Sequence, residues 1–279
     1  MATSVFKSPE ARDAFRTVYN GVLNRFPFGH QYVDTAFGRT FILTAGRETA
    51  PPVFVFHGSC SNSVFMSQEI IALSQDYRVY AVDLLGEAGN SAEFRPNLES
   101  DAFTLWLKDI FDALSVESAV MLGSSLGGWL ALKFATAYPA RVSRLILIAP
   151  GGLSGQNHEY TIKADSARAR NETLTMDEAV IGDAALPKEV VDFMNLILAS
   201  YNPITAILPV FTDDQLRRLV MPVLFIGGEN DILLDAPGAA RRISENLPHA
   251  EVHLLPNTGH IILNASDYFI PFLQKEVSP

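Results

Sequence analysis

The chain has 279 residues, of which 48% are hydrophobic and 19% charged, and its formal net charge is −10. This composition indicates a globular protein with a large buried core and excludes a disordered chain. A surface this negative repels phosphate groups, so neither nucleic acid nor an anionic membrane is expected as a partner. Because Cys60 is the single cysteine, no intramolecular disulfide can form.

The N-terminal region lacks the pattern of a secretory signal peptide. Residues 1–12 contain Lys7, Glu10 and Arg12 and no long apolar stretch. Elsewhere, no apolar run approaches the roughly 18 residues that a membrane-spanning helix needs. The sequence therefore predicts a cytoplasmic protein.

Short apolar runs alternate with longer helical patterns along the chain, which is typical of a mostly parallel sheet flanked by helices. An antiparallel pair is predicted for Tyr32–Thr35 and Thr40–Thr44, because a turn at Phe37-Gly38-Arg39 separates them. Six more strands complete an expected eight-stranded sheet: Pro52–Phe56, Tyr77–Leu84, Ser118–Leu122, Val142–Ala149, Pro222–Gly227 and Ala250–Leu255.

Five segments between these strands carry apolar residues at helical spacing. The predicted helices are Val64–Ser74, Phe103–Leu114, Leu126–Tyr138, Ala236–Leu247 and Ile261–Gln274.

Residues 151–219 interrupt the alternation, because they contain helical patterns such as Lys188–Ala199 and no convincing strand. A structureless loop of this length is uncommon in a compact domain, so we predict an inserted helical cap on a core formed by 1–150 and 220–279. The insertion leaves the carboxyl end of a strand, where open α/β sheets form their sites. It should therefore lie over the site, and Phe193 and Met194 are its candidate substrate-binding residues.

The strongest local motif is Gly123-Ser124-Ser125-Leu126-Gly127, which follows a predicted strand and precedes a predicted helix. In this context the G-x-S-x-G pattern indicates a sharp turn that exposes the central serine at the carboxyl end of the sheet. Glycines on both sides leave room for the strained backbone of that serine. Ser125 is the predicted nucleophile, and Ser124 is the neighbouring alternative.

A serine hydroxyl group needs an oriented base. His260 follows the last predicted strand in Asn257-Thr258-Gly259-His260 and reaches the same edge of the sheet as the serine. Its position favours it over the histidines outside such loops, and His57 is expected to be structural. These other histidines are His30, His158, His249 and His253.

The acid that orients the base should lie on another loop at this edge. Asp231 closes Gly227-Gly228-Glu229-Asn230-Asp231, directly after a predicted strand, and it is the candidate. Glu229 and Asp235 remain rivals. The order Ser125, Asp231, His260 agrees with the chain order expected of a serine triad whose nucleophile lies in a G-x-S-x-G turn of this kind.

Two backbone N–H groups are candidates for an oxyanion hole. That of Leu126 lies at a helix N-terminus, and that of Ser59 lies in the loop His57-Gly58-Ser59-Cys60, where Gly58 permits a tight turn. Cys60 is expected to be a small buried side chain. Neither zinc-ligand spacing nor a nucleotide-binding glycine motif occurs, so no cofactor and no metal are expected.

The chain resembles the α/β-hydrolase superfamily from Tyr32 to the C-terminus. The motifs behind this resemblance are His57-Gly58, the Asp83, Gly86 and Ser91 segment, the serine turn, Gly228–Asp231 and Gly259-His260.

Two short strings give a narrower resemblance, to bacillary carboxylesterases of the naproxen-esterase type. They are Tyr80-Ala81-Val82-Asp83 and Phe211–Arg217. One segment departs from many relatives, because Asp83–Ser91 is one residue longer than their D-x-x-G-x-G-x-S. Because this longer segment shapes a wall near the predicted site, it affects what the resemblance implies about substrate preference and leaves the predicted chemistry unchanged. Ser125 stands where dehalogenases and epoxide hydrolases of this fold carry an aspartate.

These motifs predict a carboxylic ester hydrolase that acts through an acyl-enzyme on a small, largely hydrophobic ester. One alternative is the hydrolysis of a lactone, amide or carbon–carbon bond, or perhydrolysis, by the same three residues. The other is a ligand-binding or signalling protein with negligible turnover. The oligomeric state is not predicted.

Overall fold

The computed structural model describes residues 4–170, 172, 180 and 186–276, with only the backbone of 158, 160, 161, 164 and 168. Eight strands form one sheet in the order β1-β2-β4-β3-β5-β6-β7-β8. β2 pairs antiparallel with both β1 and β4, whereas all other neighbours are parallel. The predicted eight-stranded, mostly parallel sheet is confirmed. The strands are β1 (Gly29–Thr35), β2 (Gly38–Ala45), β3 (Pro52–Phe56), β4 (Arg78–Val82), β5 (Ala119–Ser124), β6 (Val142–Ile148), β7 (Val223–Gly228) and β8 (Glu251–Leu255).

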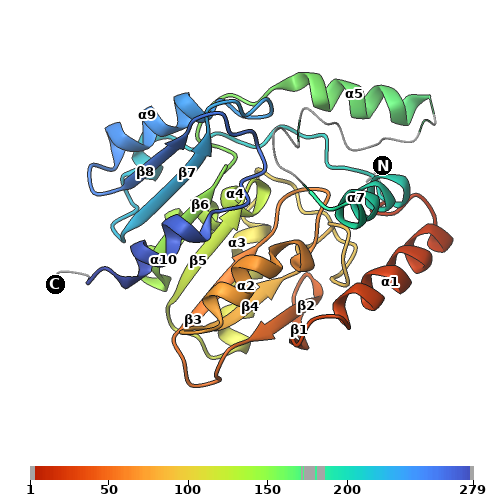
Figure 1. Cartoon of the computed structure of the whole chain (residues 1–279), viewed down its shortest axis with the longest axis horizontal. Helices are drawn as coiled ribbons and strands as arrows, with labels where there is room; N and C mark the ends of the chain where they lie inside the picture. Colours follow the sequence, from red (N-terminus) through yellow and green to blue (C-terminus); the bar gives the residue numbers. More distant parts are fainter. Residues whose placement is uncertain (1–3, 171, 173–179, 181–185, 277–279) are drawn as a thin grey trace.

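Helices cover both faces of the sheet (Figure 1). They are α1 (Pro9–Leu23), α2 (Ser67–Leu73), α3 (Ala102–Ala113), α4 (Leu126–Ala137), α5 (His158–Ala169), α7 (Lys188–Ser200), α8 (Asp213–Leu216), α9 (Ala236–Asn246) and α10 (Ser266–Gln274). Two 3₁₀ turns, η1 (Ser63–Met66) and η2 (Pro139–Arg141), accompany them.

The alternation of side chains along β3 explains this two-sided cover. Phe54 and Phe56 point to the face that packs against α3, α4 and α9. Val53 and Val55 point to the opposite face, which packs against α2 and α10. All four side chains are fully buried, as expected for a parallel strand with helices on both sides.

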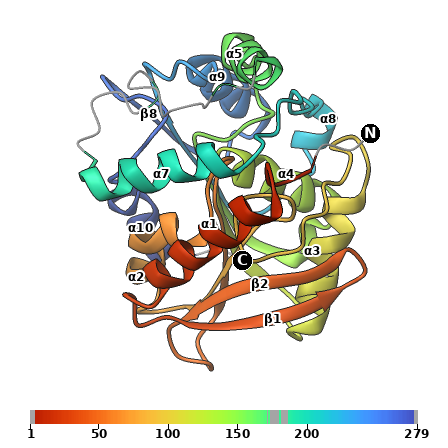
Figure 2. The same cartoon turned by 90° about the vertical axis from the view of Figure 1, so that its right-hand side faces the viewer.

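A third apolar cluster joins α1 to α7, which lie side by side in both views (Figure 1 and Figure 2). Phe193 of α7 stacks on Phe15 and Tyr19 of α1, with ring centroids 6.0 and 6.3 Å apart. We call these two helices the α1–α7 layer. The sequence analysis missed α1, although Ser8 caps it through the Ala11 N–H group and Pro9 starts it.

Two predicted helices begin later than expected. Residues 261–265 form a loop, and α10 starts only at Ser266, because this stretch carries the chain away from His260. The predicted helix Val64–Ser74 starts as the 3₁₀ turn η1, where Asp83 accepts the Ser63 N–H group at 2.9 Å and fixes the entry of the chain.

Between β6 and β7 the described residues form α5, α7 and α8. Residues 171, 173–179 and 181–185 of the predicted cap lie outside the described residues. The domain boundaries at 151 and 219 therefore stay a prediction. Within the part of the chain that the structure describes, no helix combines the length and apolar character needed to cross a membrane.

Candidate active site

Ser125 occupies a strained turn between β5 and α4. Its backbone has φ 51° and ψ −112°, a region that L-residues seldom adopt. The neighbouring glycines are sterically required, because a Cβ atom at Gly123 or Gly127 would lie 2.3 Å from a backbone oxygen. The turn is held by the Ser125 N–H group, which donates to the carbonyl of Ile148 at 2.9 Å.

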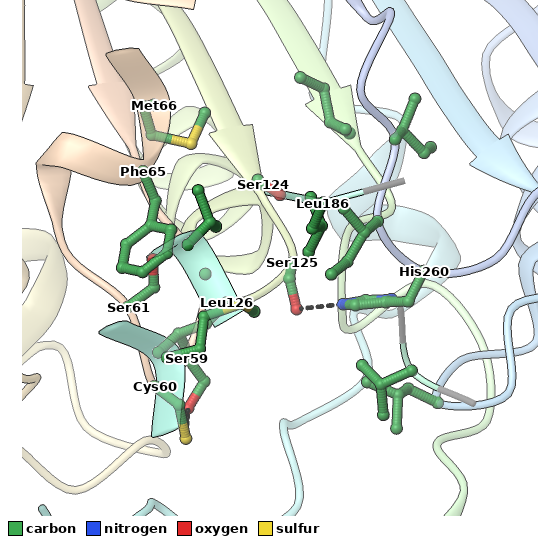
Figure 3. A pocket seen from close by; sticks show the side chains of 18 of the residues that line it. Ser59, Cys60, Ser61, Phe65, Met66, Ser124, Ser125, Leu126, Leu186 and His260 are labelled. Atoms are coloured by element: carbon green, nitrogen blue, oxygen red, sulfur yellow. Dashed lines mark hydrogen bonds between the residues drawn. The ribbon is translucent and has the colours of Figure 1, made fainter. Parts of the chain in front are cut away.

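Ser125, His260 and Asp231 form a hydrogen-bonded chain. The His260 Nε2 atom lies 3.1 Å from the Ser125 Oγ atom, a contact that Figure 3 draws as a dashed line. The His260 Nδ1 atom lies 2.8 Å from the Asp231 Oδ2 atom. Asp231 Oδ1 accepts the N–H groups of Leu233 and Leu234 at 2.8 and 3.1 Å. A carboxylate at Asp231 accepts the Nδ1 proton, which leaves Nε2 free to accept the proton of the serine hydroxyl group.

The rival acids have other surroundings. Asp235 caps α9 by accepting the Gly238 N–H group at 2.9 Å, and Glu229 is exposed. The Asp231 side chain is fully buried. Of the three acids, Asp231 is the one that the fold places against His260.

The rival histidines also lie elsewhere. His253 pairs with Glu251, His249 lies beside the Met221 carbonyl, and the His30 ring packs on Phe41. The side chain of His158 lies outside the described part.

His57 is fully buried and holds the loop after β3. Because its Nε2 atom accepts the Leu84 N–H group at 3.0 Å, the proton is on Nδ1, which donates to the Gly58 carbonyl at 2.7 Å. Burial lowers the pKa of His57, which favours this neutral form. A trans peptide directs its C=O and N–H groups in opposite directions. Fixing the Gly58 carbonyl therefore turns the Ser59 N–H group away from His57.

The two candidate oxyanion donors lie beside the serine. A Cβ atom at Gly58 would be 3.3 Å from the Ser125 Cβ atom, so the Ser59 loop passes close to the elbow. Figure 3 shows Ser125 between His260 on one side and Leu126 and Ser59 on the other. Leu126 is the first residue of α4, so its N–H group has no acceptor one turn earlier in the helix.

A cavity of about 850 Å³ opens in front of Ser125. Both predicted substrate-binding residues, Phe193 and Met194, line it. Phe193 has a second set of contacts, because its ring is 8% exposed and stacks within the α1–α7 layer. The sequence analysis missed Val22 and Phe26, which extend the wall at the end of α1.

Two buried carboxyl groups near the site were also missed. Glu69 of α2 lines the cavity, and burial raises its pKa to about 7. Glu87, in the loop after β4, is 3% exposed, and burial likewise raises its pKa to about 7. Neither residue belongs to a recognisable motif. The sequence signal that could have found them is an acidic residue in an otherwise apolar stretch, for Glu69, or in a glycine-rich stretch, for Glu87.

Cys60 beside the site is a neutral thiol. Burial, followed by the nearby Glu87, raises the pKa of Cys60 to about 12. Among the described residues, His, Cys, Asp and Glu side chains do not form any group of three that could hold a metal ion.

The alpha/beta hydrolase family matches residues 53–270, which is most of the chain. This chain belongs to the alpha/beta hydrolase family, and the resemblance predicted from its motifs is confirmed.

Similar proteins include several from Bacillus subtilis. The uncharacterized carboxylesterase nap of strain 168 is 30% identical over 268 residues, which are 91% of this chain and 89% of the relative. The crystal structure of carboxylesterase CesB (YbfK) has a TM-score of 0.82 at 26% identity and covers 96% of this chain and 100% of its own. That of naproxen esterase (carboxylesterase NP) has a TM-score of 0.80 at the same identity and coverage. The predicted similarity to bacillary esterases of this type is confirmed.

Proposed function

We propose that this protein is a carboxylesterase that uses Ser125, His260 and Asp231 as a catalytic triad. The observation that carries the proposal is the hydrogen-bonded chain from Asp231 through His260 to Ser125, which ends at a cavity. The names of the B. subtilis relatives support the choice of an ester over another acyl bond.

The proposed reaction has two acyl-transfer steps. The Ser125 oxygen attacks the ester carbonyl carbon while His260 Nε2 takes the hydroxyl proton, and the carbonyl oxygen becomes an oxyanion. The N–H groups of Ser59 and Leu126 stabilise that charge. His260 then returns the proton to the leaving alcohol. Water attacks the acyl-enzyme with His260 again as base, which releases the carboxylic acid.

The cavity indicates the class of ester. Leu126, Val190 and Met194 are among the apolar side chains around Ser125, so we propose a small, largely hydrophobic substrate. We further propose that the predicted cap sets substrate size through Phe193 and Met194 and supplies no reacting group.

Ser125→Ala tests the proposal. We expect kcat toward a small aryl ester to fall by about 10⁴- to 10⁶-fold, because triad enzymes lose most of their rate with the nucleophile. A fluorophosphonate probe followed by peptide mass mapping should label Ser125 in the wild type. Ser124→Ala is the matched control and should still be labelled. A label on Ser124, or full activity of purified Ser125→Ala, would refute the assignment.

A further inference from the structure

The loop after β3 and the loop after β4 are tied together beside the nucleophile. The Asn62 Nδ2 group donates to the Ala88 carbonyl at 3.1 Å, and the Cys60 N–H group donates to the Glu87 Oε2 atom at 2.8 Å. Glu87 belongs to the segment Asp83–Ser91, which is one residue longer than the pattern of many relatives. Its carboxyl group thus reaches the proposed oxyanion loop from a segment that departs from that pattern.

The bond from Cys60 holds the peptide that follows the proposed oxyanion donor. Ser59 lies between two peptide planes, and each plane is held from a different side. His57 fixes the carbonyl of the Gly58–Ser59 peptide, and Glu87 fixes the N–H group of the Ser59–Cys60 peptide. The two planes are joined by the φ and ψ rotations of Ser59. Holding both planes therefore fixes these rotations and, with them, the direction of the Ser59 N–H group.

Cys60 itself needs such support. Its φ is 54°, in the left-handed region that residues other than glycine seldom occupy. Without this acceptor, the part-buried Cys60 N–H group loses its hydrogen bond, and the loop relaxes toward an ordinary backbone conformation. The direction of the Ser59 N–H group would change with it.

The surroundings of Glu87 make its carboxyl group an unusual choice for a purely structural contact. Burial raises its pKa, and Tyr201 and Arg95, which act on it in the opposite sense, do not cancel this effect. Its second oxygen, Oε1, is buried, and the side chains of Tyr201 and Ser59 are close enough to lower the pKa of Glu87. Buried carboxyl groups of this kind gather at functional sites.

We propose that Glu87 is a positioning residue for the oxyanion hole, which aligns the Ser59 N–H group by accepting the N–H group of Cys60. The alignment matters only when the oxyanion forms, so Glu87 contributes to kcat and not to KM. This inference rests on the proposed function, because it needs a reaction that passes through an oxyanion at Ser125.

The test compares Glu87→Leu with Glu87→Gln, using a small aryl acetate ester. Leu fills the space without an acceptor, whereas Gln keeps an acceptor oxygen at nearly the same place. We expect Glu87→Leu to lower kcat by about 10- to 100-fold with KM within about threefold, and Glu87→Gln to recover most of that loss. Glu251→Leu, at the far end of β8 from the His260 loop, is the matched control and should keep kcat.

A ligand measurement separates positioning from packing. A trifluoromethyl ketone forms a tetrahedral oxyanion adduct with the serine, whereas the corresponding methyl ketone remains largely unreacted. Glu87→Leu should lose affinity for the first by a factor similar to its loss in kcat, and keep its affinity for the second. Wild-type kcat in Glu87→Leu would overturn the inference, as would equal losses in Glu87→Leu and Glu87→Gln.

Two further measurements cover the remaining outcomes. If Glu87→Leu does not fold, Glu87→Asp draws the acceptor back by one methylene group, and wild-type kcat in that variant would overturn the inference. If the wild type hydrolyses no ester, the proposed carboxylesterase function fails. The rate of fluorophosphonate labelling at Ser125, compared across the same variants, then tests Glu87 separately.

Discussion

The sheet and the α1–α7 layer contribute different things to the site. The sheet places Ser125, His260 and Asp231 on loops at the carboxyl ends of β5, β8 and β7, and backbone hydrogen bonds hold those loops. The layer forms a wall of the cavity through side-chain packing between α1 and α7. Backbone geometry therefore fixes the residues of the proposed triad, while side-chain packing shapes the space around them.

Asp231→Asn should have the largest effect, and it tests the sheet side of this comparison. We expect kcat to fall by about 10⁴-fold with the fold intact, because an amide stabilises the wrong tautomer of His260 and cannot balance its positive charge. Asp235→Asn is the matched control, since Asp235 only caps α9. Steady-state kinetics and thermal unfolding of both variants check this, and near-wild-type kcat in Asp231→Asn would place the acid elsewhere.

Phe193→Ala tests the layer and should change stability more than chemistry. Its ring stacks on Phe15, Tyr19 and Phe65, so we expect a loss of about 3 kcal/mol in the free energy of unfolding. Met194→Ala, on the same helix but only partly buried, should cost less and should change the ranking of ester substrates. Denaturant unfolding measures the stability of the two variants, and hydrolysis of a panel of esters measures their substrate ranking. Equal stability of the two variants would show that Phe193 does not hold the layer together.

Glu69→Gln should have the smallest effect, and it concerns the cavity wall formed by α2. The pKa of Glu69 rises from about 4.5 in the unfolded chain to about 7 in the folded one. Between these values the unfolded chain releases the proton and the folded protein keeps it. Wild-type stability should therefore fall relative to Glu69→Gln as the pH rises from about 4.5 to 7, and then level off.

We expect this difference to reach about 2 kcal/mol, less than the full pKa change would give, because cavity water reduces the cost of the charge. The titration of Glu87 contributes equally to the stability of the wild type and of Glu69→Gln, so it cancels in the difference between them. Urea unfolding at several pH values measures this stability difference between the wild type and Glu69→Gln. Glu245→Gln is the control, because Glu245 is exposed. A constant difference across this pH window would contradict a pKa of Glu69 that burial has raised.

The sheet, and the loops that carry Ser125, His260 and Asp231, could be predicted because their signals are local. Strands have apolar runs, and the Ser125 turn needs glycines whose Cβ atoms would meet the backbone. His260 and Asp231 follow strands of the same parallel sheet, so their meeting was implied by topology.

The remaining features depend on contacts between distant parts of the chain. The apolar face of α1, with Phe15 and Tyr19, acquires its partner only from α7. Glu87 acts on a backbone N–H group, which leaves no trace in the sequence. Helical periodicity predicted that Phe193 faces inward, but it could not separate the cavity from the aromatic cluster, and the ring contacts both.

The N-terminal segment joins the end of α7, which lies far away along the chain. Lys7 donates its N–H group to the Ser200 carbonyl, and the Asn202 side chain donates to the Ser4 carbonyl, 198 positions away. Loop-closure entropy grows only with the logarithm of loop length, by about 0.6 kcal/mol for each doubling. Compared with a loop of about ten residues, closing this one costs only about 2 to 3 kcal/mol more. The aromatic contacts of the layer offset that cost, so a wall of the cavity can be built from the distant beginning of the chain.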